Sequence, residues 1–248
     1  MTILVTRPQP DNDSTAAALR ARGLDVLPAP MLRFEQVPFT GDADGSYGAV
    51  IVTSANALRA IADQPVLATL RKLPLFAVGE RTADAARDVG FEHVISADGD
   101  ANALRDLVAD SVRTRRLNKT QTLLYLAGAD LARDLAGELG ARGFNVTVQT
   151  TYRMVPVTTF PVAVGDAFAA GGIEAVLHYS RRSARAFVDA ARAAGVEISA
   201  LAIPQCCLSD QVASIVRDAG ATRVLEAAQP DEAGLFAALG RALAPLSR

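Results

Sequence analysis

One pattern occurs twice along this chain of 248 residues, and the repeat limits the folds that the chain can adopt. The matched pairs of segments are 2–26 with 122–146, 47–60 with 173–186, and 73–90 with 203–220. In the first pair, Leu4 aligns with Leu124 and Leu19 aligns with Leu139. Because the three matches occur in the same order in both halves, they indicate an internal duplication, and the two copies should fold alike.

Each copy alternates short apolar segments with segments whose apolar residues recur at helical spacing, which predicts alternating strands and helices. Segments 50–52 and 76–78 are apolar at every position, as is typical of strands buried on both faces of a parallel sheet. The sequence therefore predicts an α/β fold with doubly wound parallel sheets. Ligands of such sheets bind beyond the carboxyl ends of the strands, so we expect the helix-opening loops of two stacked copies to share a cleft. These loops are 6–8, 53–56, 78–82, 127–129, 179–182 and 208–210.

Several of these loops contain residues that suit the binding of an anion. Ser54 and Ser180 are suitable N-cap residues, and Thr82 lies in another helix-opening loop, so the free N–H groups behind them can receive a negative group. Arg181 and Arg182 should fall in the first turn of a helix, where each cation is disfavoured by roughly 0.3–1 kcal/mol. Two arginines at that place are reasonable if they bind an anion; the alternative is that they extend into solvent at small cost.

Composition and missing motifs narrow the function further. The formal net charge of −2 and the isoelectric point near 5.7 argue against a surface that binds nucleic acid or an anionic membrane over its whole extent, and they leave a local basic cleft open. The spacing of metal ligands is missing, because Cys206 and Cys207 are adjacent and the two histidines are far apart in the sequence. The sequence also has no glycine-rich phosphate loop and no nucleophile elbow. We therefore expect neither cofactor nor metal. The absence of a signal-like start and of a long apolar run predicts a cytoplasmic protein.

Five segments occur in the order and spacing of one enzyme family. They are "ILVTRP" at the start, "VIVTSANAL" (50–58), "FAVGERTADAARDVGF" (76–91), "GARGFNVTVQTTYRMVP" (140–156) and "AVLHYSRRSARAF" (175–187). With these motifs the chain resembles the uroporphyrinogen-III synthase family over about residues 2–245. The resemblance implies two flavodoxin-like domains, joined by two strand-like linkers, with the active site in a cleft between them.

Mapped on this sequence, the resemblance places residues 1–34 and 156–248 in a first, discontinuous domain and residues 38–151 in an inserted second domain. Prolines mark both crossings and agree with this division. The sequence alone also allows a single cut near Asn118.

The resemblance also implies a cofactor-free lyase that cyclises the linear tetrapyrrole hydroxymethylbilane to uroporphyrinogen III, in the biosynthesis of haem, sirohaem, cobalamin or chlorophyll. Water leaves the terminal hydroxymethyl group to give an azafulvene, a spiro intermediate forms at ring D, and ring D is inverted on closure. Tyr152 takes the place of a family tyrosine that assists departure of the hydroxyl, and Thr82 that of a family hydroxyl residue. The alternatives are packing for Tyr152 and capping for Thr82. The residues expected to bind substrate are Arg7, Ser54, Ser180, Arg181, Arg182 and Ser209.

Two loops depart from the family pattern. Residues 180–183 are Ser-Arg-Arg-Ser where a Ser-Pro-Ser-like run is common, and residues 209–212 are Ser-Asp-Gln-Val where Gly and two threonines are common. The second departure adds the carboxylate of Asp210 to an expected anion site, for which Arg182 or its neighbours would compensate.

We expect a polycarboxylate small molecule as the partner, no nucleic acid, no membrane, and a monomer with at most a transient contact to the preceding pathway enzyme. One alternative is a non-catalytic bilobed module that binds a small anionic molecule, which explains the duplication and the cleft but not the placement of Tyr152 and Thr82. A sugar-phosphate or nucleotide enzyme is a second alternative, and the missing phosphate loops weigh against it.

Overall fold

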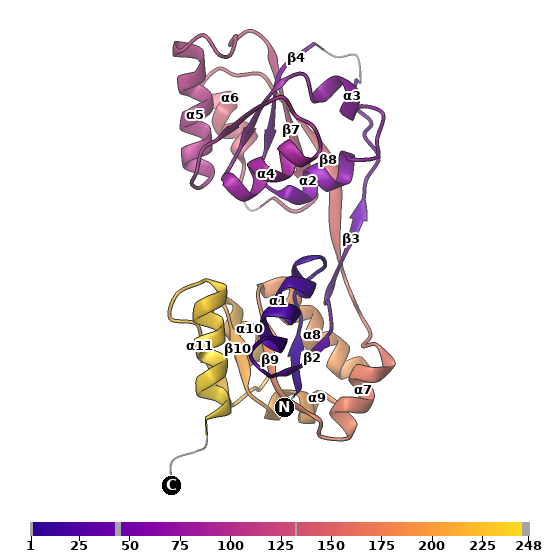
Figure 1. Ribbon diagram of the computed structural model, residues 1–248. Coiled ribbons are helices and arrows are strands. Elements are labelled where there is room, and N and C mark those ends of the chain that lie inside the picture. Colours follow the sequence, from indigo (N-terminus) through magenta and orange to yellow (C-terminus); the bar gives the residue numbers. More distant parts are fainter. Residues whose placement is uncertain (1, 43–45, 132, 245–248) are drawn as a thin grey trace. The chain divides into compact units, whose positions relative to one another are not determined.

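The computed structural model describes residues 2–42, 46–131 and 133–244 (Figure 1). The chain divides into two compact units. Unit 1 comprises residues 1–34 and 155–248, and unit 2 comprises residues 35–154.

Unit 1 contains a parallel sheet of five strands in the order β11-β10-β9-β1-β2. The strands are β1 (Thr2–Val5), β2 (Asp25–Pro28), β9 (Ile173–His178), β10 (Gln205–Cys207) and β11 (Val224–Glu226). The helices are α1 (Asp11–Arg20), α7 (Val162–Ala169), α8 (Arg181–Ala193), α9 (Glu197–Ala202), α10 (Asp210–Asp218) and α11 (Glu232–Leu243). Leu4 and Val176 are buried beneath α8 and α10, whereas Ile3 and Leu177 are buried on the opposite face beneath α1 and α11. Both faces of the sheet are therefore covered, as predicted.

Unit 2 has the same layered construction. Its strands are β4 (Tyr47–Val52), β5 (Pro74–Ala77), β6 (His93–Ser96), β7 (Thr122–Gly128) and β8 (Val146–Pro156), in the parallel order β8-β7-β4-β5-β6, with β3 (Leu32–Gln36) beside β8. Its helices are α2 (Ala55–Ile61), α3 (Leu67–Leu70), α4 (Glu80–Asp88), α5 (Ala101–Arg113) and α6 (Leu135–Ala141). Val50 and Val52 pack against α2 and α4, while Ala49 and Ile51 pack against α5 and α6. Because β4 is apolar at consecutive positions, its side chains pack into the cores on both faces of the sheet.

Each unit combines strands from both copies of the repeat. Unit 1 takes β1 and β2 from the first copy and β9, β10 and β11 from the second, while unit 2 takes β7 and β8 from the second copy and β4, β5 and β6 from the first. The two sheets have the same strand order if β7 and β8 are matched with β1 and β2, and β4, β5 and β6 with β9, β10 and β11. This equality supports the duplication that the sequence predicts.

The chain passes from one unit to the other within β3, between residues 34 and 35, and within β8, between residues 154 and 155. The expected domain ranges place these crossings between residues 34 and 38 and between residues 151 and 156.

Two of the predicted helix starts are confirmed by N-cap hydrogen bonds. Ser54 and Ser180 are N-caps, as predicted, and their hydroxyl oxygens accept hydrogen bonds from the backbone N–H groups of Asn56 and Ser183. The expected loop at 78–82 is shorter than predicted, because the extended backbone of Gly79 lets α4 begin at Glu80. Thr82 therefore lies inside the first turn of α4 and not in a loop.

Candidate active site

Tyr152 lies on β8 at the level where the neighbouring strand β7 ends. The parallel pairing places Gly128 opposite Tyr152, after a register irregularity between Ala127 and Gly128. A Cβ atom on Gly128 would lie 2.7 Å from Cζ and 2.9 Å from the hydroxyl oxygen of Tyr152. The ring of Tyr152 thus occupies the space that a side chain at position 128 would need, and glycine permits this close approach.

The Tyr152 side chain lines a pocket of about 310 Å³ within unit 2. Most polar groups of the lining are hydroxyls, and they belong to Thr53, Ser54, Tyr125 and Tyr152. The charged side chains of the lining are Arg133 and Asp130. Hydroxyl groups donate and accept hydrogen bonds, so this lining suits a ligand rich in oxygen atoms.

The sequence did not identify two of these hydroxyls, those of Thr53 and Tyr125, as site residues. The Thr53 hydroxyl lies 2.9 Å from the Tyr125 hydroxyl, although 72 positions separate the two residues. The usable signal is the single phenol in strand 122–128, whose other buried residues are aliphatic. A buried phenol hydroxyl requires a partner, and the sequence does not reveal which one.

Thr82 lies apart from this group. The residue is 7% exposed, its backbone N–H donates to Gly79 O at 3.0 Å, and it does not belong to the lining of the Tyr152 pocket. Of the residues selected from the sequence in unit 2, the structure brings Tyr152 and Ser54 together in one pocket and leaves Thr82 outside its lining.

Arg133 is held at the pocket by a carboxylate. Its Nη2 lies 2.7 Å from Glu138 Oε2, and its Nε forms a second bond to the same carboxylate. Arg105 Nη1 donates to Glu138 Oε2 at 3.1 Å. The hydrogen bond from Arg133, together with that from Arg105, lowers the pKa of Glu138, so this carboxylate stays charged and orients both guanidinium groups.

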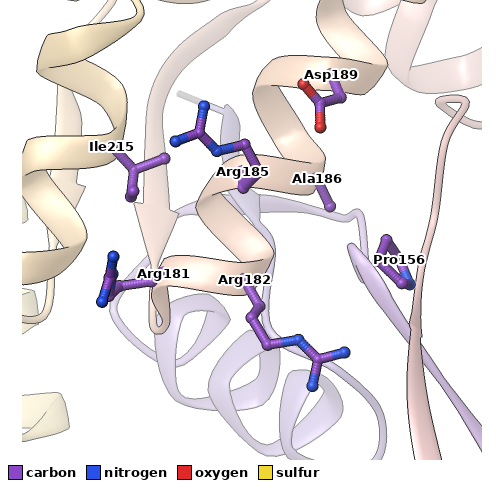
Figure 2. Close-up of a pocket in the computed structure, with 7 residues that line it drawn as sticks. All are labelled: Pro156, Arg181, Arg182, Arg185, Ala186, Asp189 and Ile215. Atoms are coloured by element: carbon purple, nitrogen blue, oxygen red, sulfur yellow. The ribbon is translucent and has the colours of Figure 1, made fainter. Parts of the chain in front are cut away.

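In unit 1, α8 begins at Arg181, as predicted. The exposed side chains of Arg181, Arg182 and Arg185 border a groove of about 400 Å³ (Figure 2). The rest of its lining is Pro156, Ala186, Asp189 and Ile215. Figure 2 shows the guanidinium groups of Arg181 and Arg182 pointing in different directions from the first turn of α8. Within the described residues, Arg181 and Arg185 form no ion pair.

Arg7 is bound by groups of unit 1. Its guanidinium lies 3.2 Å from Asp11 Oδ2 and 3.3 Å from Glu232 Oε1, and its Cζ lies 4.8 Å from the ring centre of Tyr179. The Thr15 hydroxyl also donates to Glu232 Oε1, at 2.6 Å. These contacts join the ends of β1 and β9 to α1 and α11, so a substrate carboxylate at Arg7 would have to replace one of its present partners.

Ser209 is the N-cap residue of α10, and its side chain makes no capping hydrogen bond. The neighbouring Asp210 pairs with Arg217, with 3.1 Å between Oδ1 and Nη1. The additional carboxylate therefore begins α10 and pairs with a cation two turns along the same helix, which also binds Glu226.

No three His, Cys, Asp or Glu residues of the described part of the chain are grouped so that they could hold a metal ion. Burial raises the pKa of the Cys206 and Cys207 thiols to about 12, which keeps them protonated and poorly nucleophilic. In the parts of the chain that the structure describes, every helix is too short or too polar to cross a bilayer.

A family model described as uroporphyrinogen-III synthase HemD matches residues 13–237. The chain belongs to the uroporphyrinogen-III synthase family. Among solved structures, it is similar to uroporphyrinogen-III synthetase from Helicobacter pylori, with 16% identity, a TM-score of 0.66, and coverage of 98% of this chain and 99% of that chain. A mutant uroporphyrinogen III synthase from the extremely thermophilic bacterium Thermus thermophilus has 17% identity, a TM-score of 0.55 and coverage of 98% of both chains. A search of curated proteins found no match.

The two solved structures share the α/β fold, and the family match carries the function. The protein is a cyclising lyase that converts hydroxymethylbilane to uroporphyrinogen III in tetrapyrrole biosynthesis.

Proposed function

We propose that this protein forms uroporphyrinogen III by holding the terminal hydroxymethyl group of its substrate against Tyr152 in the pocket of unit 2. The placement of the Tyr152 hydroxyl over Gly128, in a pocket lined by three further hydroxyl side chains, carries the proposal. This pocket lies at the carboxyl ends of β4 and β7, where parallel sheets bind their ligands.

In the first step, the C–O bond of the hydroxymethyl group breaks and the hydroxyl leaves as water. The Tyr152 phenol donates its proton to the departing oxygen, and the pyrrole electrons form the exocyclic double bond of an azafulvenium ion. Loss of the pyrrole N–H proton to the phenolate gives the neutral azafulvene and restores the phenol. A positioned weak acid of this kind contributes a factor of about 10²–10⁴ in rate.

The remaining steps require positioning more than acid strength. The azafulvene carbon bonds to the substituted α-carbon of ring D to give the spiro intermediate. The bond from that α-carbon to the methylene of ring C then breaks, the methylene bonds to the free α-carbon of ring D, and this carbon loses its proton, so that ring D is inverted. Because the free substrate closes to the symmetrical type I isomer, the protein must hold ring D so that only the inverted closure is reached.

The substrate carries an acetate and a propionate on each pyrrole, so it is a polyanion, whereas the chain has a net charge of −2. Local positive groups must therefore bind it. Arg181, Arg182 and the hydroxyl of Ser180 are proposed to bind substrate carboxylates from unit 1, and Ser54 from unit 2. Arginine binds carboxylates well because its planar guanidinium can donate two parallel hydrogen bonds.

The test is to incubate the purified protein with freshly generated hydroxymethylbilane and to separate the isomers formed. We expect an excess of type III over type I, with type I alone in a heat-denatured control. Binding of hydroxymethylbilane without type III formation would contradict the proposal and would fit the non-catalytic binding module.

We further propose that the protein is a cytoplasmic monomer that contacts the preceding pathway enzyme only transiently. Light scattering on the purified protein tests the first point, since a monomer has a mass of 26.0 kDa.

A further inference from the structure

Tyr125 is an unusual residue for its position. It lies in the middle of β7, the residue is 3% exposed, and it packs in a core that includes Ile51, Phe76 and Leu123. A phenylalanine would fill the same volume without bringing a polar atom into the core. A buried hydroxyl costs free energy unless it is hydrogen-bonded, so the phenol oxygen needs a partner.

Thr53 is that partner. Val52 pairs with Leu126 across β4 and β7, so Thr53 is the first residue beyond the end of β4, and its hydroxyl lies 2.9 Å from that of Tyr125. Both residues line the pocket that contains Tyr152. The pair therefore joins the core of the sheet to the wall of the proposed active site.

The Thr53–Tyr125 pair has one hydroxyl proton left for a further hydrogen bond. Two hydroxyls carry two protons, and the bond between them uses one. Within the described residues, no other hydrogen bond of either hydroxyl is present, so the second proton has no acceptor there. Since both side chains border the pocket, the remaining proton is available to a ligand in it.

We propose that Tyr125 is a positioning residue that orients the Thr53 hydroxyl so that its proton binds a carboxylate oxygen of the substrate beside Tyr152. This inference rests on the proposed function. The phenol is the more acidic hydroxyl and is the better donor, so Tyr125 donates to Thr53 and Thr53 donates to the substrate. A chain of hydrogen bonds with one direction strengthens its last member, because each bond polarises the next.

The charge state of Tyr125 agrees with this direction. Burial raises the pKa of its phenol above the ordinary value, and the hydrogen bond with Thr53 offsets only part of that effect. The phenol therefore keeps its proton and remains a donor at neutral pH. Ser54, the next residue along the loop, also keeps its own hydroxyl proton, since its oxygen accepts from Asn56 N in the N-cap.

The test is Tyr125→Phe, which removes the hydroxyl and keeps the ring. The reaction leaves this carboxylate unchanged, so a weaker hydrogen bond to it reduces binding of the ground state and of the transition state alike. We therefore expect KM to rise about three- to tenfold with kcat nearly unchanged. The matched control is Tyr47→Phe, which removes a phenol hydroxyl from the opposite end of the same sheet, at the start of β4, and should leave both constants unchanged.

Coupling within the pair gives a second readout. Thr53→Val should raise KM as much as Tyr125→Phe, and the double variant should be no worse than either single variant, because each change alone breaks the chain. Thr53→Ser should restore a normal KM. Additive effects, a fall in kcat without a change in KM, or wild-type constants for Tyr125→Phe would each overturn the inference. All of these results require a wild-type protein that forms the type III isomer, so failure of the proposed function would be recognised separately.

Discussion

Tyr152 is the residue on which the proposed chemistry depends. For Tyr152→Phe we expect kcat to fall by roughly ten- to a thousandfold, because the change removes one hydroxyl donor at the departing oxygen. The thermal unfolding temperature should change little, since the ring and its packing remain. Steady-state kinetics with isomer analysis checks the rate. A wild-type rate would show that Tyr152 serves only in packing.

Gly128 provides an independent test of the same hydroxyl. In Gly128→Ala, the new Cβ would lie 2.7 Å from Cζ of Tyr152, so the ring must swing away and carry its hydroxyl with it. We expect kcat to fall by about tenfold or more, since catalysis is sensitive to shifts of about 1 Å. The control is Gly140→Ala, because a Cβ at Gly140 meets no atom within 4 Å. Equal activity of the two variants would argue against a role for the position of the Tyr152 hydroxyl.

At the scale of single elements, the first turn of α8 combines two cations with the positive end of a helix dipole. Changing Arg181 and Arg182 together to Ala should raise KM about tenfold or more, with a smaller effect on kcat, because the carboxylates that they bind survive the reaction. The salt dependence of KM should weaken. Stability should not fall, since two cations leave the helix N-terminus.

Arg192 in the last turn of α8 is the matched control for this pair. It is bound to Glu197, with 2.7 Å between Nε and Oε1, and it lies outside the groove lining. Arg192→Ala should leave KM and its salt dependence unchanged. If the double variant at positions 181 and 182 also kept the wild-type KM and its salt dependence, those arginines would face solvent without binding the substrate.

His178, a buried histidine at the end of β9, contacts a residue of β10 and the residue that follows β1. Both Nε2 hydrogens of Gln205 donate to backbone carbonyls, of Ala200 at 2.8 Å and Ile203 at 2.9 Å. Its Oε1 therefore faces His178 Nε2, at 2.9 Å, as an acceptor. Thr6 Oγ1, which donates to Leu177 O, lies 3.5 Å from Nδ1. The short contact to the Gln205 acceptor assigns the proton of the neutral imidazole to Nε2. Nδ1 receives no proton from Thr6, because the Thr6 hydroxyl proton is used at Leu177 O.

This histidine should make stability depend on pH. Burial lowers the pKa of His178 from 6.5 to about 4, although the bond to Gln205 opposes the shift. Between these values the unfolded chain binds the proton and the folded chain does not, so stability is lost as pH falls from about 6.5 to 4, by about 3 kcal/mol in total. Denaturant unfolding at several pH values measures this loss. The variant His178→Gln should lose this part of the pH dependence, and an unchanged pH profile would contradict the assignment.

At the scale of the whole molecule, we predict that catalysis needs no metal or cofactor. The described residues offer no metal-ligand cluster, and the proposed chemistry uses only a phenol, neutral hydroxyls and arginines. Protein treated with a chelator and dialysed extensively should keep its full rate of type III formation. A loss of activity that an added metal ion restores would contradict this prediction.

The sequence by itself determined the features that depend on local order. The 3.6-residue and uniformly apolar patterns predicted doubly wound sheets, and the placement of Ser54 and Ser180 predicted where α2 and α8 begin. Both features depend on neighbouring residues, because helix periodicity and N-capping involve positions only a few residues apart. The repeat also predicted that the two copies contain equivalent strands, and these strands occupy equivalent places in the two sheets.

Only the tertiary structure decided which side chains meet. Thr53 meets Tyr125 across 72 positions, Arg7 meets Glu232 across 225, and Tyr152 lies over Gly128 because of one register irregularity between β7 and β8. Nothing in local periodicity encodes such pairs, since they follow from strand order and register. The burial of Thr82 is also a tertiary property, because it depends on the packing of α4 within unit 2. Local sequence sets the elements, and the packing of distant segments sets the site.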